Sequence, residues 1–155
     1  MVQYAFYQNT HGLWKIGYEN GCIVWLKQVE SPDTVSVPSQ VSDAAAQQLQ
    51  EYLLGYRSSF DLPLNPSGTD FQHRVWAALM GIPWGKTRTY GEIAAAAGHP
   101  SAARAVGQAA NKNPIWIVIP CHRMVGKRNK LTGYAGGTEL KQTLLNLEQK
   151  KTPET

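Results

Sequence analysis

The stretch TYGEIAAAAGHPSAARAVGQAAN, residues 89–111, contains two short helical segments separated by a turn. Gly98 can end the first helix, His99 and Pro100 lie in the turn, and Ser101 is the expected N-cap of the second helix. This is the layout of a helix-turn-helix, which many proteins use to place a helix in a groove of DNA. Helical hairpins of this size also occur in cores that touch no nucleic acid, so the layout alone leaves both interpretations open.

The second of these helices has a surface with very few side-chain atoms. Its small residues are Ala102, Ala103, Ala105, Gly107, Ala109 and Ala110. Such a surface permits close backbone approach, either to other helices in a core or to the floor of a DNA groove. Arg104 stands alone among these residues, and burying an unpaired guanidinium is costly. The isolated arginine therefore favours an exposed helix that faces DNA.

Helical patterns also dominate the sequence on both sides of this stretch. Residues 71–82 carry apolar side chains at helical spacing and follow the possible N-caps Thr69 and Asp70. Residues 139–150 predict a final amphipathic helix. The run IWIVI, residues 115–119, predicts a buried strand that ends where a proline follows it.

The first part of the chain has a different pattern. Residues 4–8, 13–19 and 22–29 are rich in aromatic and β-branched residues and are separated by turn signals, so they predict a small antiparallel three-stranded sheet. Residues 42–54 predict a helix with Ser42 as its N-cap.

A proline-rich segment separates the two patterns. FDLPLNPSGTD, residues 60–70, suits neither a helix nor a central strand and predicts a linker. We therefore expect an N-terminal domain over residues 1–66 with a structural role, and a second domain over residues 67–155. The fold class is α+β: a small three-stranded antiparallel sheet domain, and a mainly helical domain with a winged-helix-like helix-turn-helix.

The overall composition limits the class of protein. The chain has 155 residues, 43% hydrophobic and 17% charged, which is typical of globular proteins. No apolar run approaches the roughly 20 residues of a membrane span, and the N-terminus lacks the features of a secretory signal. We therefore expect a cytoplasmic or nucleoid-associated protein, with reduced thiols at Cys22 and Cys121 and no membrane association. His11, His73 and Cys22 lack metal-ligand spacing, so no metal site is predicted.

The net charge of +4 is unevenly distributed. Residues 1–66 contain three Lys or Arg against six Asp or Glu, a balance of −3, whereas residues 67–155 contain twelve against five, a balance of +7. A concentrated positive charge attracts polyanions, although many basic domains bind none.

Cys121 lies where the predicted strand 115–119 ends, in the sequence IPCHRMVG. A free thiol has a pKa near 8.5, so a base or cation nearby is needed to raise the thiolate population at neutral pH. His122 and Arg123 are adjacent in sequence, but neighbours in an extended strand point to opposite faces. Contact between Cys121 and His122 thus requires a turn or an intervening water. A buried cysteine acting as a small hydrophobe is the alternative.

The sequence IPCHRMVG, with TYGEIA before it, SAARAVGQAANKNP between and LTGYAGG after it, closely resembles the O6-alkylguanine-DNA alkyltransferases. The resemblance covers residues 71–149, whereas the first part of the chain matches only in layout. It implies an enzyme, a methylated-DNA–protein-cysteine S-methyltransferase, that transfers an alkyl group from O6-alkylguanine in DNA to one of its own cysteines. Such a protein flips the damaged base out through the minor groove and is irreversibly inactivated by a single reaction.

The resemblance also implies roles for five residues in the reaction. Cys121 would be the acceptor nucleophile. His122 would act as a base through a bound water, and Glu148 would orient that histidine. Tyr90 would donate a proton or hydrogen bond to the leaving guanine. Asn113 would brace the turn between the second short helix and the segment of Cys121.

Further residues would contact the DNA or the alkyl group. Arg104 would fill the space left by the flipped nucleotide. The expected DNA contacts are Arg104, Tyr90, Ala102, Ala103, Gly107 and Arg123. The alkyl pocket would be lined by Met124, Tyr134 and Ala135. Two of these depart from the usual pattern, since Met124 stands where valine is common and Ala135 where some relatives have serine.

The implied partner is double-stranded DNA containing O6-alkylguanine, bound by a monomer with no cofactor and no obligate protein partner. Related damage-binding proteins that cannot dealkylate lack the acceptor cysteine, whereas Cys121 is present. Two alternatives from other classes stay open: a regulatory DNA-binding module with the thiol as a sensor, and a cysteine hydrolase using Cys121 and His122. A hydrolase turns over repeatedly, whereas a thioether on Cys121 offers water no leaving group.

Overall fold

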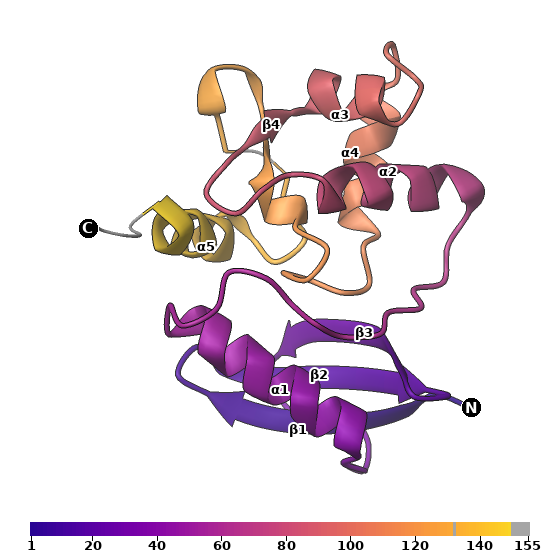
Figure 1. The fold of residues 1–155 in the computed structure, drawn as a ribbon, viewed down its shortest axis with the longest axis vertical. Helices are drawn as coiled ribbons and strands as arrows, with labels where there is room; N and C mark the ends of the chain where they lie inside the picture. The colour runs from indigo at the N-terminus through magenta and orange to yellow at the C-terminus, as the bar shows by residue number, and fades with distance from the viewer. Residues whose placement is uncertain (132, 150–155) are drawn as a thin grey trace. The chain divides into compact units, whose positions relative to one another are not determined.

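A computed structural model describes residues 1–131 and 133–149 of the chain, which form two compact units (Figure 1). The first unit comprises Met1–Ser67 together with the short segment Pro114–Trp116, and the second comprises Gly68–Asn113 and, among the described residues after it, 117–131 and 133–149. The boundary expected after residue 66 differs from this division by one residue. The inclusion of Pro114–Trp116 in the first unit was not predicted. Among the described residues, the helices lack the length and hydrophobicity of a membrane-spanning segment.

The sheet of the first unit is the predicted antiparallel meander. Its strands are β1 (Gln3–Asn9), β2 (Gly12–Glu19) and β3 (Cys22–Val29), in the order β1-β2-β3. The turn between β2 and β3 consists of Asn20 and Gly21, both with positive φ, which is the backbone conformation of tight two-residue hairpin turns. The α+β class and the three-stranded sheet are thereby confirmed.

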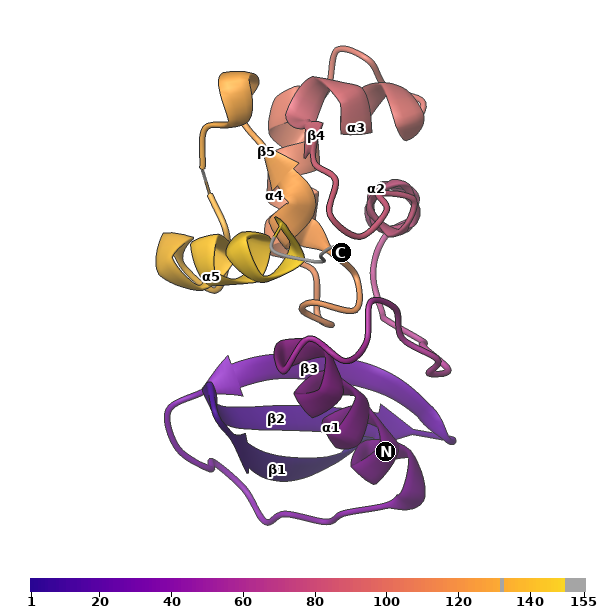
Figure 2. The same ribbon diagram turned by 60° about the vertical axis from the view of Figure 1, so that its left-hand side comes forward.

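Helix α1 (Gln40–Leu53) lies across one face of this sheet (Figure 2). It begins two residues earlier than predicted, because Ser39 and not Ser42 is its N-cap. Ser39 and Ser42 form a reciprocal capping box, in which Ser42 occupies the third helical position. The Ser42 hydroxyl also lies 2.8 Å from the Tyr7 hydroxyl of β1, which links the helix start to the sheet.

The apolar run 115–119 is not a strand, contrary to the prediction. Ile115 makes one isolated parallel bridge with Leu26 of β3, in which the Leu26 amide donates to Pro114 and the Trp116 amide donates to Leu26, both at 2.8 Å. Ile117 then has a φ of 74°, a left-handed conformation that a β-branched residue rarely adopts. The chain therefore turns at Ile117 instead of continuing along β3.

In the described part of the second unit there are four α-helices: α2 (Asp70–Met80), α3 (Tyr90–Ala96), α4 (Ala103–Asn111) and α5 (Thr138–Gln149). The first three pack on one another, and α3 and α4 form the predicted helix-turn-helix. Thr69 caps α2 as expected. The prediction for α4 was wrong, since its N-cap is Ala102, which makes no side-chain capping bond, and not Ser101.

A short parallel ladder that the sequence did not indicate connects two distant parts of this unit. Strand β4 (Arg88–Thr89), directly before α3, pairs with β5 (Met124–Val125), directly after the Cys121 turn. The two-residue ladder thus ties the start of the helix-turn-helix to the segment that carries the cysteine.

Candidate active site

Cys121 begins a single turn of 3-10 helix, η1 (Cys121–Arg123), and has 4% of its surface exposed. The turn is closed by a hydrogen bond from the Arg123 amide to the Pro120 carbonyl at 2.9 Å. In such a turn successive side chains point in directions about 120° apart, not to opposite faces as in a strand. Cys121 and His122 therefore do not point to opposite faces, as they would in an extended strand, and the turn required for them to act together is present.

Asn113, just beyond α4, is fully buried and braces this turn. Its Nδ2 donates to the Ile119 carbonyl oxygen at 2.9 Å and lies 3.2 Å from Cys121 Sγ. A donor directed at sulfur stabilises the thiolate more than the thiol, because hydrogen bonds to the charged form favour that form. One side chain thus fixes the approach to the turn and supplies a donor to its sulfur.

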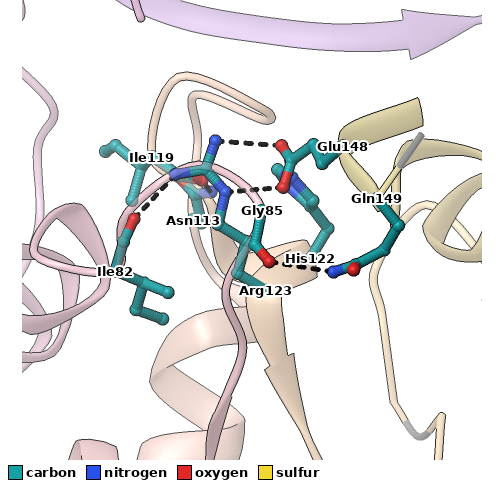
Figure 3. Close-up of polar contacts among 8 residues, drawn as sticks. All are labelled: Ile82, Gly85, Asn113, Ile119, His122, Arg123, Glu148 and Gln149. Carbon is teal, nitrogen blue, oxygen red and sulfur yellow. Dashed lines mark hydrogen bonds and ion pairs between the residues drawn. The ribbon is translucent and has the colours of Figure 1, made fainter. Parts of the chain in front are cut away.

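His122 and Glu148 form a buried pair between η1 and α5 (Figure 3). His122 Nε2 lies 2.8 Å from Glu148 Oε2, and both side chains are inaccessible to solvent. Burial lowers the pKa of His122 below its ordinary value of 6.5, although the Glu148 carboxylate opposes this shift. The imidazole is therefore neutral at physiological pH, which is the form that can accept a proton.

Arg123, expected among the DNA contacts, instead belongs to this buried cluster. Its Nε and Nη2 donate to the two carboxylate oxygens of Glu148, each at 2.9 Å, and its Nη1 donates to the Ile82 carbonyl at 2.8 Å (Figure 3). Only 8% of the residue is exposed, so its guanidinium is committed to the interior of the unit. A buried carboxylate needs a compensating charge, and Arg123 supplies it, so this geometry does not favour the expected contact of Arg123 with DNA, which stays a prediction.

Lys141 of α5 is a charged residue that sequence reasoning missed. It is 1% exposed, and its Nζ donates to the Met124 carbonyl of β5 at 2.5 Å. Burial lowers the pKa of Lys141, and its attraction to the Cys121 thiolate opposes this shift. The signal was present in the sequence, because Lys141 is separated from Leu144, Leu145 and Glu148 by three, four and seven residues and so lies on one helix face with them.

Tyr90 opens α3 immediately after β4, and its ring packs against Gly107 of α4. The residues expected around the alkyl group differ in exposure. Met124 and Tyr134 are 2% and 8% exposed, whereas Ala135 lies at the surface. The structure thus places two of the three in the interior of the unit.

The predicted DNA-facing side of α4 is at least partly accessible. Arg104 is exposed in the first turn of the helix, and Ala102, Ala103 and Gly107 are half-buried. The opposite face, with Val106, Ala109 and Ala110, is buried. The arrangement leaves a thin helix surface from which one long cationic side chain extends.

The buried imidazole should make stability depend on pH. Folding lowers the pKa of His122. As pH falls through about 6.5, His122 therefore becomes protonated in the unfolded chain but stays neutral in the folded protein, which favours unfolding. We expect the free energy of unfolding, measured by urea denaturation, to fall more steeply from pH 7 to pH 5 in the wild-type protein than in a His122→Gln variant. Equal slopes in the two proteins would show that His122 is protonated as readily folded as unfolded.

Comparisons with known proteins agree with these observations. A family model described as "6-O-methylguanine DNA methyltransferase, DNA binding domain" matches residues 70–150. The methylated-DNA–protein-cysteine methyltransferase of Methanosarcina acetivorans is 52% identical over 122 residues, which are 79% of this chain and 78% of the relative.

Solved structures extend the similarity over both units. A crystal structure of Mycobacterium tuberculosis O6-methylguanine methyltransferase matches with a TM-score of 0.90 and 41% identity, covering 100% of this chain and 97% of the other. A structure of Mycobacterium tuberculosis OGT in complex with DNA matches with a TM-score of 0.87 and 42% identity, covering 95% and 92%. The family model over residues 70–150 and the 52% identity to a curated relative show that the chain belongs to the 6-O-methylguanine-DNA methyltransferase family.

Proposed function

We propose that this protein repairs DNA by moving the alkyl group of an O6-alkylguanine onto Cys121 in a single irreversible step. One observation carries this proposal: the buried turn η1 contains both Cys121 and His122. Asn113 donates to the sulfur of the cysteine, and Glu148 is paired with the histidine. This is the arrangement of nucleophile, base and orienting group found in enzymes that activate a weak nucleophile. The second unit carries the reaction, and the first has a structural role.

In the proposed step, His122 takes the thiol proton of Cys121 through a water molecule, and the Glu148 carboxylate holds the imidazole in position. The thiolate attacks the alkyl carbon, so that a carbon–sulfur bond forms as the bond between that carbon and guanine O6 breaks. The electron pair of the broken bond stays with the guanine, and Tyr90 donates a hydrogen bond or proton so that the base does not leave as a full anion. The thioether has no leaving group, and the protein acts once.

The guanine must leave the duplex for this reaction. A thiol with 4% of its residue surface exposed cannot reach an oxygen inside a stacked helix, so the nucleotide has to be turned out into the protein. In the proposal, α4 approaches the minor groove with its thin face of Ala102, Ala103 and Gly107, and Arg104 occupies the space of the extruded base. Met124, Tyr134 and Ala135 line the alkyl pocket. A monomer acting in the cytoplasm or nucleoid, without a cofactor, suffices for these steps.

Stoichiometry tests this function. The protein is mixed with increasing amounts of a duplex oligonucleotide containing O6-methylguanine, and restored guanine is measured by nucleoside chromatography. We expect one guanine restored per protein molecule, after which the reaction stops. Continued restoration with excess substrate would indicate a hydrolase, and sequence-specific binding to undamaged DNA without restoration would indicate a regulatory module.

Replacing Arg104 by alanine should reduce transfer from duplex DNA by about tenfold or more, because unstacking a base costs a few kcal/mol and nothing would then fill the gap. The rate at which iodoacetamide alkylates Cys121 should not change, since Arg104 lies on the exposed face of α4. Arg74→Ala, which removes an exposed arginine from α2, is the matched control for charge. If the transfer rate falls equally in the two variants, Arg104 acts only as a positive charge that attracts phosphates and does not fill the gap.

A further inference from the structure

The ring of Tyr90 lies where a side chain on Gly107 would stand. A Cβ placed on Gly107 would be 2.9 Å from Cε2 and 3.4 Å from Cδ2 of that ring, and real Cβ atoms essentially never show contacts below 3.0 Å. Gly107 has no positive φ and sits inside α4, where alanine is the better helix former. The glycine is therefore explained by the neighbouring ring and not by the backbone conformation of the helix.

The hydroxyl end of the same ring lies beside a second glycine. A Cβ on Gly133, in the loop directly before Tyr134, would be 3.5 Å from the Tyr90 hydroxyl oxygen. The ring thus extends from the surface of α4 to the backbone of this loop, and a shift at Gly107 would move the hydroxyl. Tyr90 begins α3 right after the β4–β5 ladder, so its own backbone is held by strand pairing and by the Thr89 cap.

We propose that Gly107 is a positioning residue, whose missing side chain sets the place of the Tyr90 hydroxyl during transfer. This inference rests on the role proposed above for Tyr90 as hydrogen-bond or proton donor to the leaving guanine. Gly107 acts through the ring. A methyl group at position 107 pushes the ring off its place on α4 and moves the donor away from the base.

Gly107→Ala tests this proposal, with single-turnover transfer from an O6-methylguanine duplex as the main measurement. We expect the rate to fall about 10- to 100-fold, since displacing a reacting group by about 1 Å has effects of this size. Alkylation of Cys121 by iodoacetamide should be unchanged, because the thiol and its partners are not touched. Gly91→Ala is the matched control, since a Cβ there would meet only Thr89 Oγ1 at 3.9 Å.

A methyl group at position 107 could act instead by blocking the approach of DNA, and a double-mutant cycle separates the two effects. In a Tyr90→Ala background the ring is absent, so we expect the additional Gly107→Ala substitution to leave the transfer rate unchanged. Losses that multiply in the double variant would overturn the proposal, as would a Gly107→Ala rate equal to that of the wild type.

The same measurements distinguish failure of this inference from failure of the proposed function. If the wild-type protein transfers no methyl group, the proposed function itself is wrong. If the wild type transfers and Tyr90→Phe transfers equally fast, the donor role of Tyr90 is wrong, and this inference fails with it. If Tyr90→Phe is slow and Gly107→Ala is fast, only the positioning role of Gly107 is wrong.

Discussion

Replacing Cys121 by serine is expected to abolish methyl transfer and leave DNA binding unchanged. The serine hydroxyl keeps the volume of the thiol nearly constant and can still accept the hydrogen bond from Asn113 Nδ2. Its pKa lies far above that of a thiol, however, so a neutral imidazole cannot generate a useful population of the anion. Transfer is measured as restored guanine and binding as the mobility shift of a duplex containing O6-methylguanine.

The chain provides a matched control for this substitution in its other cysteine. Cys22 begins β3 in the first unit and is half-buried. Cys22→Ser should transfer one methyl group per molecule at the wild-type rate. Transfer by Cys121→Ser, or its loss in Cys22→Ser, would contradict the assignment of the nucleophile.

Replacing Glu148 by glutamine should damage both stability and reactivity. The Glu148 carboxylate is fully buried and receives two hydrogen bonds from Arg123 in addition to its contact with His122. Removing the charge leaves the Arg123 guanidinium buried without compensation, for which losses of about 3–5 kcal/mol are typical. We expect the free energy of unfolding to fall by about this amount in urea denaturation, and the transfer rate of the remaining folded protein to fall about 100-fold or more.

The control for charge is Glu139→Gln, on the exposed first turn of the same helix, α5. It should change the free energy of unfolding by no more than about 1 kcal/mol, which is the usual effect of a carboxylate near a helix N-terminus. A Glu148→Gln variant as stable and as reactive as Glu139→Gln would show that the buried cluster does not support the reaction.

Local patterns predicted most of the secondary structure, because they depend on residues close together in the sequence. The three strands follow from alternation and turn residues, and α2 follows from its apolar spacing and its Thr69 cap. Errors at helix starts have a local cause as well. Ser39 and Ser42 are three residues apart and each can cap, so the choice depends on Ser42 bonding back to Ser39.

Long-range pairing explains what the sequence could not indicate. The run 115–119 has the composition of a strand, but Ile115 forms an isolated bridge with Leu26 instead of a continuous ladder, and the positive φ of Ile117 turns the chain away from β3. The resemblance implied Arg123 as a DNA contact, and its ion pair with a carboxylate could not be seen in the sequence. Its partner Glu148 is 25 residues away on another element.

In the candidate site, too, some residues were predicted from the sequence and others were found only in the structure. The resemblance of the sequence around Cys121 pointed to Cys121, His122 and Glu148, and the structure brings the histidine and the glutamate into contact in the turn that carries the cysteine. The buried Lys141 was overlooked because a lysine in an amphipathic helix is ordinarily exposed. Its position on the apolar face of α5 was the available sign.

The most direct test of the central claim is the mass of the protein after reaction with a duplex containing one O6-methylguanine. Protease digestion and mass spectrometry should find one methyl group on the peptide that contains Cys121, in the same proportion as the guanine restored in the DNA. An unmodified Cys121 peptide in a sample whose guanine has been restored would contradict direct transfer to this sulfur.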